Sequence, residues 1–191
     1  MRRSVLVGTA LSVLLCGCTG GEHGREPEDT VLIQVFGVDR MGGLCLLTAA
    51  GPNGKGETVI QSVEGKNLEE AFAALPGSGE EWISVKNVTH ILLGDGVDPT
   101  EVLAFILDDS GMSWRAFVWY APIAGAVISE EKDGGNGRLS VLERAGEKTV
   151  CMLDVLAELK ETGRVSVPML ARVDGQLEIS GSLSYEMERV R

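Results

Sequence analysis

The chain has 191 residues and a formal net charge of −11 at pH 7, and 44% of its residues are hydrophobic. This acidic balance argues against nucleic-acid binding and against attachment to anionic lipid through a basic patch. The length and apolar content suit one compact domain, or one domain with an appendage, with a sizeable packed core.

The first eighteen residues have the pattern of a bacterial lipoprotein signal peptide. Two arginines precede an apolar run over residues 5–15, which is too short for a permanent membrane span but typical of a signal peptide. The sequence Leu15-Cys16-Gly17-Cys18 then fits the site cut by the lipoprotein signal peptidase. We therefore expect residues 1–17 to be removed and Cys18 to carry a diacylglycerol, whose two acyl chains suffice for stable anchoring. The alternatives are an ordinary secretory signal with an incidental cysteine and a short anchor that is never cleaved.

Residues 18–30 are predicted to form a polar tether between this lipid and the fold. They are rich in glycine and charge and lack an apolar run that could pack. Because two positive charges leave with the leader, cleavage would take the formal charge from −11 to −13. We expect the anchored protein to sit on the outer face of the cell membrane.

Short β-branched runs separated by glycine-rich turns begin at residue 31. Residues 31–38 predict a strand buried on both faces, and a tight turn leads into a second strand over residues 44–50. A third strand is expected over residues 58–64, after a turn at residues 51–56. This turn contains Gly-Lys but lacks the first glycine and the magnesium-binding hydroxyl of a phosphate-binding loop, so we interpret it as a hairpin turn.

Two helices have clear start signals. Asn67 is expected to cap a helix that runs to Leu75, with Glu70 reaching back toward its start. After a strand over residues 83–93, an Asp-Pro-Thr-Glu sequence predicts a second, largely buried helix over residues 99–109. A strand over residues 115–121 follows.

The rest of the chain is predicted to contain one more helix and a hairpin. Residues 129–138 are polar and glycine-rich and are interpreted as a surface loop or the edge of the first domain. A helix over residues 149–161, ended by a glycine, precedes a hairpin of residues 165–171 and 177–185 with an Asp-Gly turn.

This order of elements predicts an α/β (α+β) fold, a mixed β-sheet with helices packed on it. We expect the main domain to span residues 31–128. Residues 129–191 are expected to form a helix-plus-hairpin extension.

The sequence contains few residues that could form a catalytic or metal-binding site. Cys45 and Cys151 lie in apolar runs at a spacing that fits no zinc motif, and either a disulfide or two free thiols is open, with free buried thiols favoured. The two histidines, His23 in the tether and His90 in an apolar strand, offer little for a metal or acid–base site. We expect no enzymatic activity, no metal and no cofactor, with carboxylates paired by the fold as the alternative.

An aromatic cluster is the one feature that suggests a binding face. Trp114, Trp119 and Tyr120 lie in or beside the strand over residues 115–121. Because Trp and Tyr are enriched at interfaces but also fill cores, these three residues are candidate partner contacts with core packing as the alternative.

The order of several motifs resembles the N-terminal region of the C subunits of spore germinant receptors, the Ger(x)C lipoproteins. The resemblance is carried by Cys18, by residues 35–40 and 63–71 and, most specifically, by the strand–helix–strand run over residues 91–119. It extends from about residue 31 to 121 and is faint beyond, and we expect the protein to lack the family's long C-terminal domain. At the start of the tether, Thr19-Gly20 stands where family members usually have Trp-Asp.

This resemblance implies a fold like the Ger(x)C N-terminal domain and a non-enzymatic role in a spore germinant (nutrient) receptor-like complex. The implied partners are polytopic membrane subunits, and the implied location is the spore inner membrane. The alternatives are a solute-binding or other assembly lipoprotein outside the cytoplasm of a spore-forming bacterium, and an exported enzyme that uses carboxylates.

Overall fold

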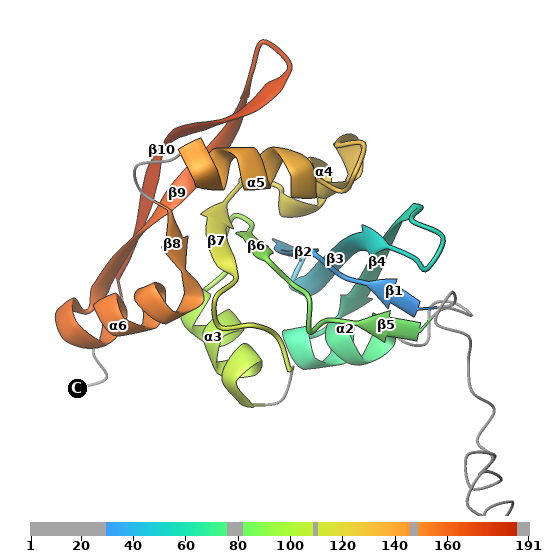
Figure 1. The fold of residues 1–191 in the computed structure, drawn as a ribbon. Helices are drawn as coiled ribbons and strands as arrows, with labels where there is room; N and C mark the ends of the chain where they lie inside the picture. Colours follow the sequence, from blue (N-terminus) through green and yellow to red (C-terminus); the bar gives the residue numbers. More distant parts are fainter. Residues whose placement is uncertain (1–29, 76–81, 109–110, 146–148, 187–191) are drawn as a thin grey trace, which may run out of the picture.

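The computed structural model describes residues 30–75, 82–108, 111–145 and 149–186 (Figure 1). The predicted leader, the predicted lipidation site Cys18 and most of the predicted tether lie outside the described residues.

The centre of the fold is an eight-stranded mixed sheet. Its strands are β2 (Val35–Met41), β3 (Leu44–Pro52), β4 (Thr58–Gly65), β6 (His90–Leu93), β7 (Phe117–Tyr120), β8 (Val150–Cys151), β9 (Arg164–Val173) and β10 (Gln176–Glu186). Their spatial order is β10-β9-β7-β6-β2-β3-β4, with β8 paired to β7 beside this path. Strands β2, β6, β7 and β9 run parallel, and an antiparallel hairpin partner continues the sheet on each side.

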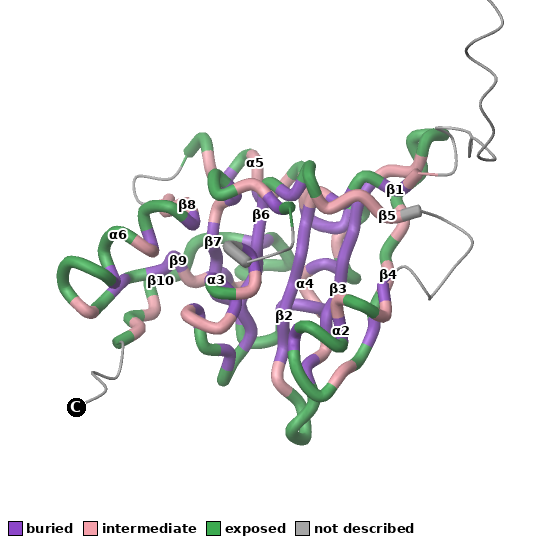
Figure 2. The backbone as a smooth tube through the Cα atoms, turned by 90° about the horizontal axis from the view of Figure 1, so that it is seen from below, coloured by how far each residue is buried: buried purple, intermediate pink, exposed green. Residues whose placement is uncertain are grey.

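Five helices cover both faces of this sheet. They are α2 (Leu68–Ala74), α3 (Pro99–Asp108), α4 (Ala124–Glu130), α5 (Asn136–Ala145) and α6 (Met152–Thr162). Helices α2, α3 and α6 lie on one face, and α4 and α5 lie on the other (Figure 1). Successive side chains of β2 point to opposite faces of the sheet. Phe36 and Val38 therefore pack toward α2, α3 and α6, and Val35 packs toward α4 and α5. Buried positions follow the central strands through the molecule (Figure 2). The predicted α/β fold class is therefore confirmed.

The helix signals of the sequence act as predicted. The side chain of Asn67 accepts a hydrogen bond of 2.8 Å from the backbone N–H of Glu70. Asp98 Oδ1 accepts one of 2.8 Å from the N–H of Thr100 at the start of α3. Helix α6 ends at Gly163 with a φ of 75°, in the left-handed region that glycine adopts without strain.

The hairpin of β9 and β10 is confirmed with its turn. Asp174 and Gly175 have φ values of 51° and 80°, as a two-residue turn of type I′ requires.

The predicted strand over residues 31–38 is interrupted. Strand β1 (Thr30–Leu32) pairs instead with β5 (Trp82–Ser84) in a separate two-stranded parallel sheet, and β2 begins at Val35. The reason is a close crossing with β3, since a Cβ on Gly51 would lie 1.9 Å from the carbonyl oxygen of Leu32. The predicted strand over residues 83–93 likewise divides into β5 and β6.

The loop predicted over residues 129–138 is present but shorter, since only residues 131–135 are non-helical. Helix α4 ends at Glu130 and α5 begins at Asn136, and Gly134 and Gly135 join them with φ values of 66° and 87°. The division expected after residue 128 does not coincide with a break in the sheet, because β8 and β9 both pair with β7.

Candidate functional site

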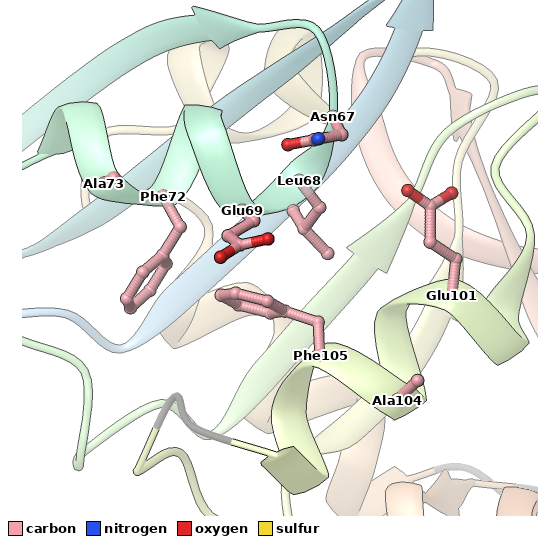
Figure 3. Close-up of a pocket in the computed structure, with 8 residues that line it drawn as sticks. All are labelled: Asn67, Leu68, Glu69, Phe72, Ala73, Glu101, Ala104 and Phe105. Atoms are coloured by element: carbon pink, nitrogen blue, oxygen red, sulfur yellow. The ribbon is translucent and has the colours of Figure 1, made fainter.

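A groove with a volume of about 510 Å³ lies between α2 and α3 (Figure 3). The residues that line it are Asn67, Leu68, Glu69, Phe72, Ala73, Glu101, Ala104 and Phe105. Apolar side chains therefore form most of its wall, and two carboxylates project into it.

The two helices form this groove because each buries only part of its apolar surface against the sheet. Leu103 and Ile106 of α3 are in the core, whereas Phe72 and Phe105 are half-buried where the helices face each other. The two rings meet edge to face, with centroids 4.9 Å apart and an interplanar angle of 66°. This geometry stabilises an aromatic pair by about 0.5–1.5 kcal/mol beyond its area burial.

The carboxylates around the groove differ in whether their oxygens form hydrogen bonds or ion pairs. Both carboxylate oxygens of Glu101 accept hydrogen bonds from Arg40, and this bonding raises the pKa of the arginine. Glu70 accepts a hydrogen bond of 3.0 Å from the backbone N–H of Lys66 and lies 3.8 Å from its ammonium. Glu69 is exposed, and its side chain has no hydrogen bond or ion pair with any other residue that the structure describes. One carboxylate at the groove is therefore uncommitted.

Asp39 is a second notable carboxylate, but it is fully engaged by the fold. It is buried within β2, and its two oxygens accept hydrogen bonds of 2.8 Å from the N–H groups of Ala124 and Gly125. Gly94 has no room for a side chain, since a Cβ there would lie 2.0 Å from Asp39 Oδ1. Asp39 thus positions the start of α4.

His90 lies inside the core. Its Nδ1 accepts a hydrogen bond of 3.3 Å from Trp119 Nε1, so its Nε2 carries the proton and donates to Ser140 Oγ at 3.2 Å. Burial lowers the pKa of His90 from 6.5 to about 4, which keeps the ring neutral near pH 7. The arrangement is that of a satisfied core histidine.

Both cysteines of the described fold are free thiols. Cys45 is buried, and burial raises its pKa. Cys151 is half-buried at the start of α6. The alternative of a disulfide between these two residues is not realised in the structure.

The predicted aromatic contact surface is only partly exposed. Trp114 has 53% of its surface exposed, and its carbonyl accepts a hydrogen bond from the N–H of Leu153, another exposed apolar residue. Trp119 is fully buried against α4 and α5, and Tyr120 is buried toward the opposite layer. The prediction is therefore wrong for Trp119 and Tyr120, which fill the core because successive residues of a central strand face its two helical layers.

The groove residues were not predicted as a site, although a signal exists in the sequence. Glu69 precedes Phe72 by three positions and Glu101 precedes Phe105 by four, so each helix carries a carboxylate and an aromatic ring on one face. The meeting of the two helices depends on the face of the sheet on which both of them pack. The pairing of these two motifs is therefore visible only in three dimensions.

Metal-ligand clusters and membrane-spanning helices are both absent from the part of the chain that the structure describes. No group of three or more His, Cys, Asp or Glu side chains within them is placed to hold a metal ion. No helix among these residues combines the length and apolarity needed to cross a bilayer.

The groove offers binding chemistry: an apolar wall, an aromatic pair and an uncommitted carboxylate. No protein-family model, curated protein or solved structure matches this chain.

Proposed function

We propose that the protein is a lipid-anchored, non-enzymatic subunit of a germinant-receptor-like complex and acts by binding polytopic membrane partners. The observation that carries this proposal is the sequence Leu15-Cys16-Gly17-Cys18 behind a positively charged start and a short apolar run. Lipidation of Cys18 would hold the protein on the outer face of the cell membrane, which is the spore inner membrane if the family role applies.

The resemblance to the Ger(x)C lipoproteins supports this function. Its most specific motifs fall on the consecutive elements β6, α3 and β7, which form one parallel strand–helix–strand unit. A further motif, residues 35–40, contains Asp39, which positions α4. The motifs thus fall on residues that organise the fold, as expected of a scaffold for assembly.

Anchoring also makes a small contact surface sufficient. A protein confined to the membrane beside its partner has a high effective concentration, so a weak interface is occupied without a large buried area. Trp114 and the groove between α2 and α3 are the two exposed apolar features that we assign to such contacts.

The anchor is tested by Cys18→Ala in the native host. We expect the variant to accumulate as an uncleaved precursor or to leave the membrane fraction, and to lose incorporation of radiolabelled palmitate. Cys151→Ala is the matched control, because it removes a half-buried thiol that has no part in anchoring. Equal palmitate labelling of wild type and Cys18→Ala would contradict the proposed anchor.

The complex is tested by crosslinking in native membranes followed by mass spectrometry. We expect a polytopic membrane protein to be recovered with the wild type and recovered less with Trp114→Ala. Failure to recover one, together with unaltered nutrient-triggered germination in a deletion strain, would reject the proposed function.

A solute-binding lipoprotein is the second candidate. The groove volume of about 510 Å³ falls within the range of small-molecule sites, about 300–1,000 Å³. A rise in the melting temperature with amino acids or sugars would favour this alternative.

A further inference from the structure

We propose that the groove between α2 and α3 binds a cationic, apolar segment of a partner protein, with one lysine or arginine side chain seated between Glu69 and the ring of Phe105. The inference rests on the proposed function in one respect, which is that the protein acts by binding.

The charge of the groove selects a cation. Glu69 projects from α2 on the side that faces Phe105 (Figure 3), and its side chain is exposed without a partner among the described residues. The other carboxylate, Glu101, is held by Arg40 and closes one side of the groove. A single uncompensated negative charge is therefore available, and the face of a phenyl ring attracts the same cation that the carboxylate attracts.

The apolar wall of the groove favours hydrocarbon groups next to the bound cation. Phe72 and Phe105 are half-buried and present hydrocarbon surface to solvent through the groove, and the buried Leu68 lines it as well. The aliphatic stem of lysine or arginine packs on such a surface while its charged end reaches a carboxylate. Apolar residues next to that side chain would cover the remainder.

The shape of the groove favours a protein segment over a free amine. Ala73 and Ala104 are exposed on the two helices that border it, and their small side chains leave the space above the rings open. A segment that lies between two helices in this way contacts both of them. The overall charge of −11 attracts basic partners from a distance, and the groove supplies the local contacts.

The test uses the full chain as its host produces it, in nanodiscs of uncharged phosphatidylcholine, because anionic lipid would itself bind a basic peptide. The probe is a short fluorescein-labelled peptide with one central lysine between two leucines, and binding is followed by fluorescence anisotropy with empty nanodiscs subtracted. We expect binding to weaken at least fivefold when the lysine is replaced by glutamine or the leucines by serine.

Two pairs of variants locate the site. We expect Glu69→Gln to weaken binding of the lysine peptide at least fivefold, while Glu158→Gln, which removes the same charge from an exposed position on α6, changes it less than twofold. We expect Ala104→Gln to obstruct the groove, while Ala157→Gln on α6 leaves binding unchanged. A circular dichroism melt of each variant checks folding, and the exposed Glu69 pair decides the result if Ala104→Gln is unstable.

Three outcomes would overturn the proposal. Equal weakening by Glu69→Gln and Glu158→Gln would show that the peptide responds to overall charge. Competition by n-butylammonium at concentrations equal to those of the peptide would show a site for small free amines. No binding of the peptide by the folded wild type would reject the groove as a docking surface. None of these measurements depends on palmitate labelling or germination, so the groove and the proposed function fail separately.

Discussion

His90 is a titratable side chain held neutral inside the core between the sheet and α5. Its two ring nitrogens are satisfied by Trp119 and Ser140, and neither contact favours a charged ring. Because its pKa is about 4 in the fold and 6.5 as an unperturbed group, protonation opposes folding.

Because the pKa of His90 is lower in the folded protein than in the unfolded chain, the stability of the fold should depend on pH. Between pH 6.5 and about 4 the unfolded chain binds a proton that the folded protein does not bind. The free energy of unfolding should therefore fall by up to about 3 kcal/mol across this window and level off below it. Urea unfolding from pH 7 to pH 4 should give a flatter profile for His90→Gln than for the wild type. His23→Gln, at the other histidine, is the control, and identical slopes for His90→Gln and the wild type would contradict the assignment.

Asp39 carries a second prediction at the scale of single residues. In Asp39→Asn one carboxylate oxygen becomes an amide group, which would face a backbone N–H of α4 as donor against donor. We expect a loss of about 1–3 kcal/mol in the free energy of unfolding. Asp95→Asn, at an exposed position, should change it by less than about 0.5 kcal/mol. Equal effects of the two substitutions in chemical denaturation would show that Asp39 does not hold α4.

Helix α3 contributes side chains both to the hydrophobic core and to the groove. One side of it contributes Val102, Leu103 and Ile106 to the sheet-facing layer, and the other side presents Glu101, Ala104 and Phe105 to the groove. A substitution on the core side of α3 should therefore mainly lower the free energy of unfolding. A substitution on the groove side should mainly weaken binding.

The buried side of α3 gives a direct test of packing. Leu103 has 3% of its surface exposed, and Leu103→Ala should lower the free energy of unfolding by about 2–5 kcal/mol. Leu153 on α6 has 51% exposed, so Leu153→Ala should have an effect below about 0.5 kcal/mol. Urea denaturation with Leu103→Ala as stable as the wild type would contradict the packing of this helix.

The elements also show how far the sequence alone leads. Helices α2 and α3 were predictable because Asn67 and Asp98 cap them locally. Helices α4 and α5 were missed because Gly134 and Gly135 interrupt the apolar spacing between them. The break before β2 depends on its crossing with Gly51, which no local pattern records. The groove was missed for the same reason, since its two helices meet only through tertiary packing.

At the scale of the whole molecule, the chain after residue 128 belongs to the same core as the chain before it. Strand β9 pairs with β7 and contributes Val165, Val167 and Leu170 to the two core layers. On β9, Arg172 also forms ion pairs of 2.9 Å with Glu130 and 3.0 Å with Glu131 at the end of α4. The hairpin is thus fastened to both the sheet and a helix.

This continuity predicts that residues 1–128 do not fold alone. Without the later residues, Trp119 would lose the cover of α5, and β7 would become an edge strand with an apolar surface. We expect the fragment to aggregate or to show no cooperative thermal transition by circular dichroism, whereas the full chain unfolds in one transition. A cooperative transition in the fragment would restore the division after residue 128.

A force applied to the N-terminal end of the chain would act on the short strand β1 before it acts on the large sheet. Strand β1 runs parallel to β5, and next to it Ile33 and Gln34 donate hydrogen bonds of 2.9 and 2.8 Å to Ser84 and Ala50. A pull along the strand from its N-terminal side would load these bonds in shear, so several must break together before the large sheet is reached. Optical-tweezers traces pulled from the N-terminal end should therefore show an early, separate rupture, and the main sheet would keep its shape while that end is under tension.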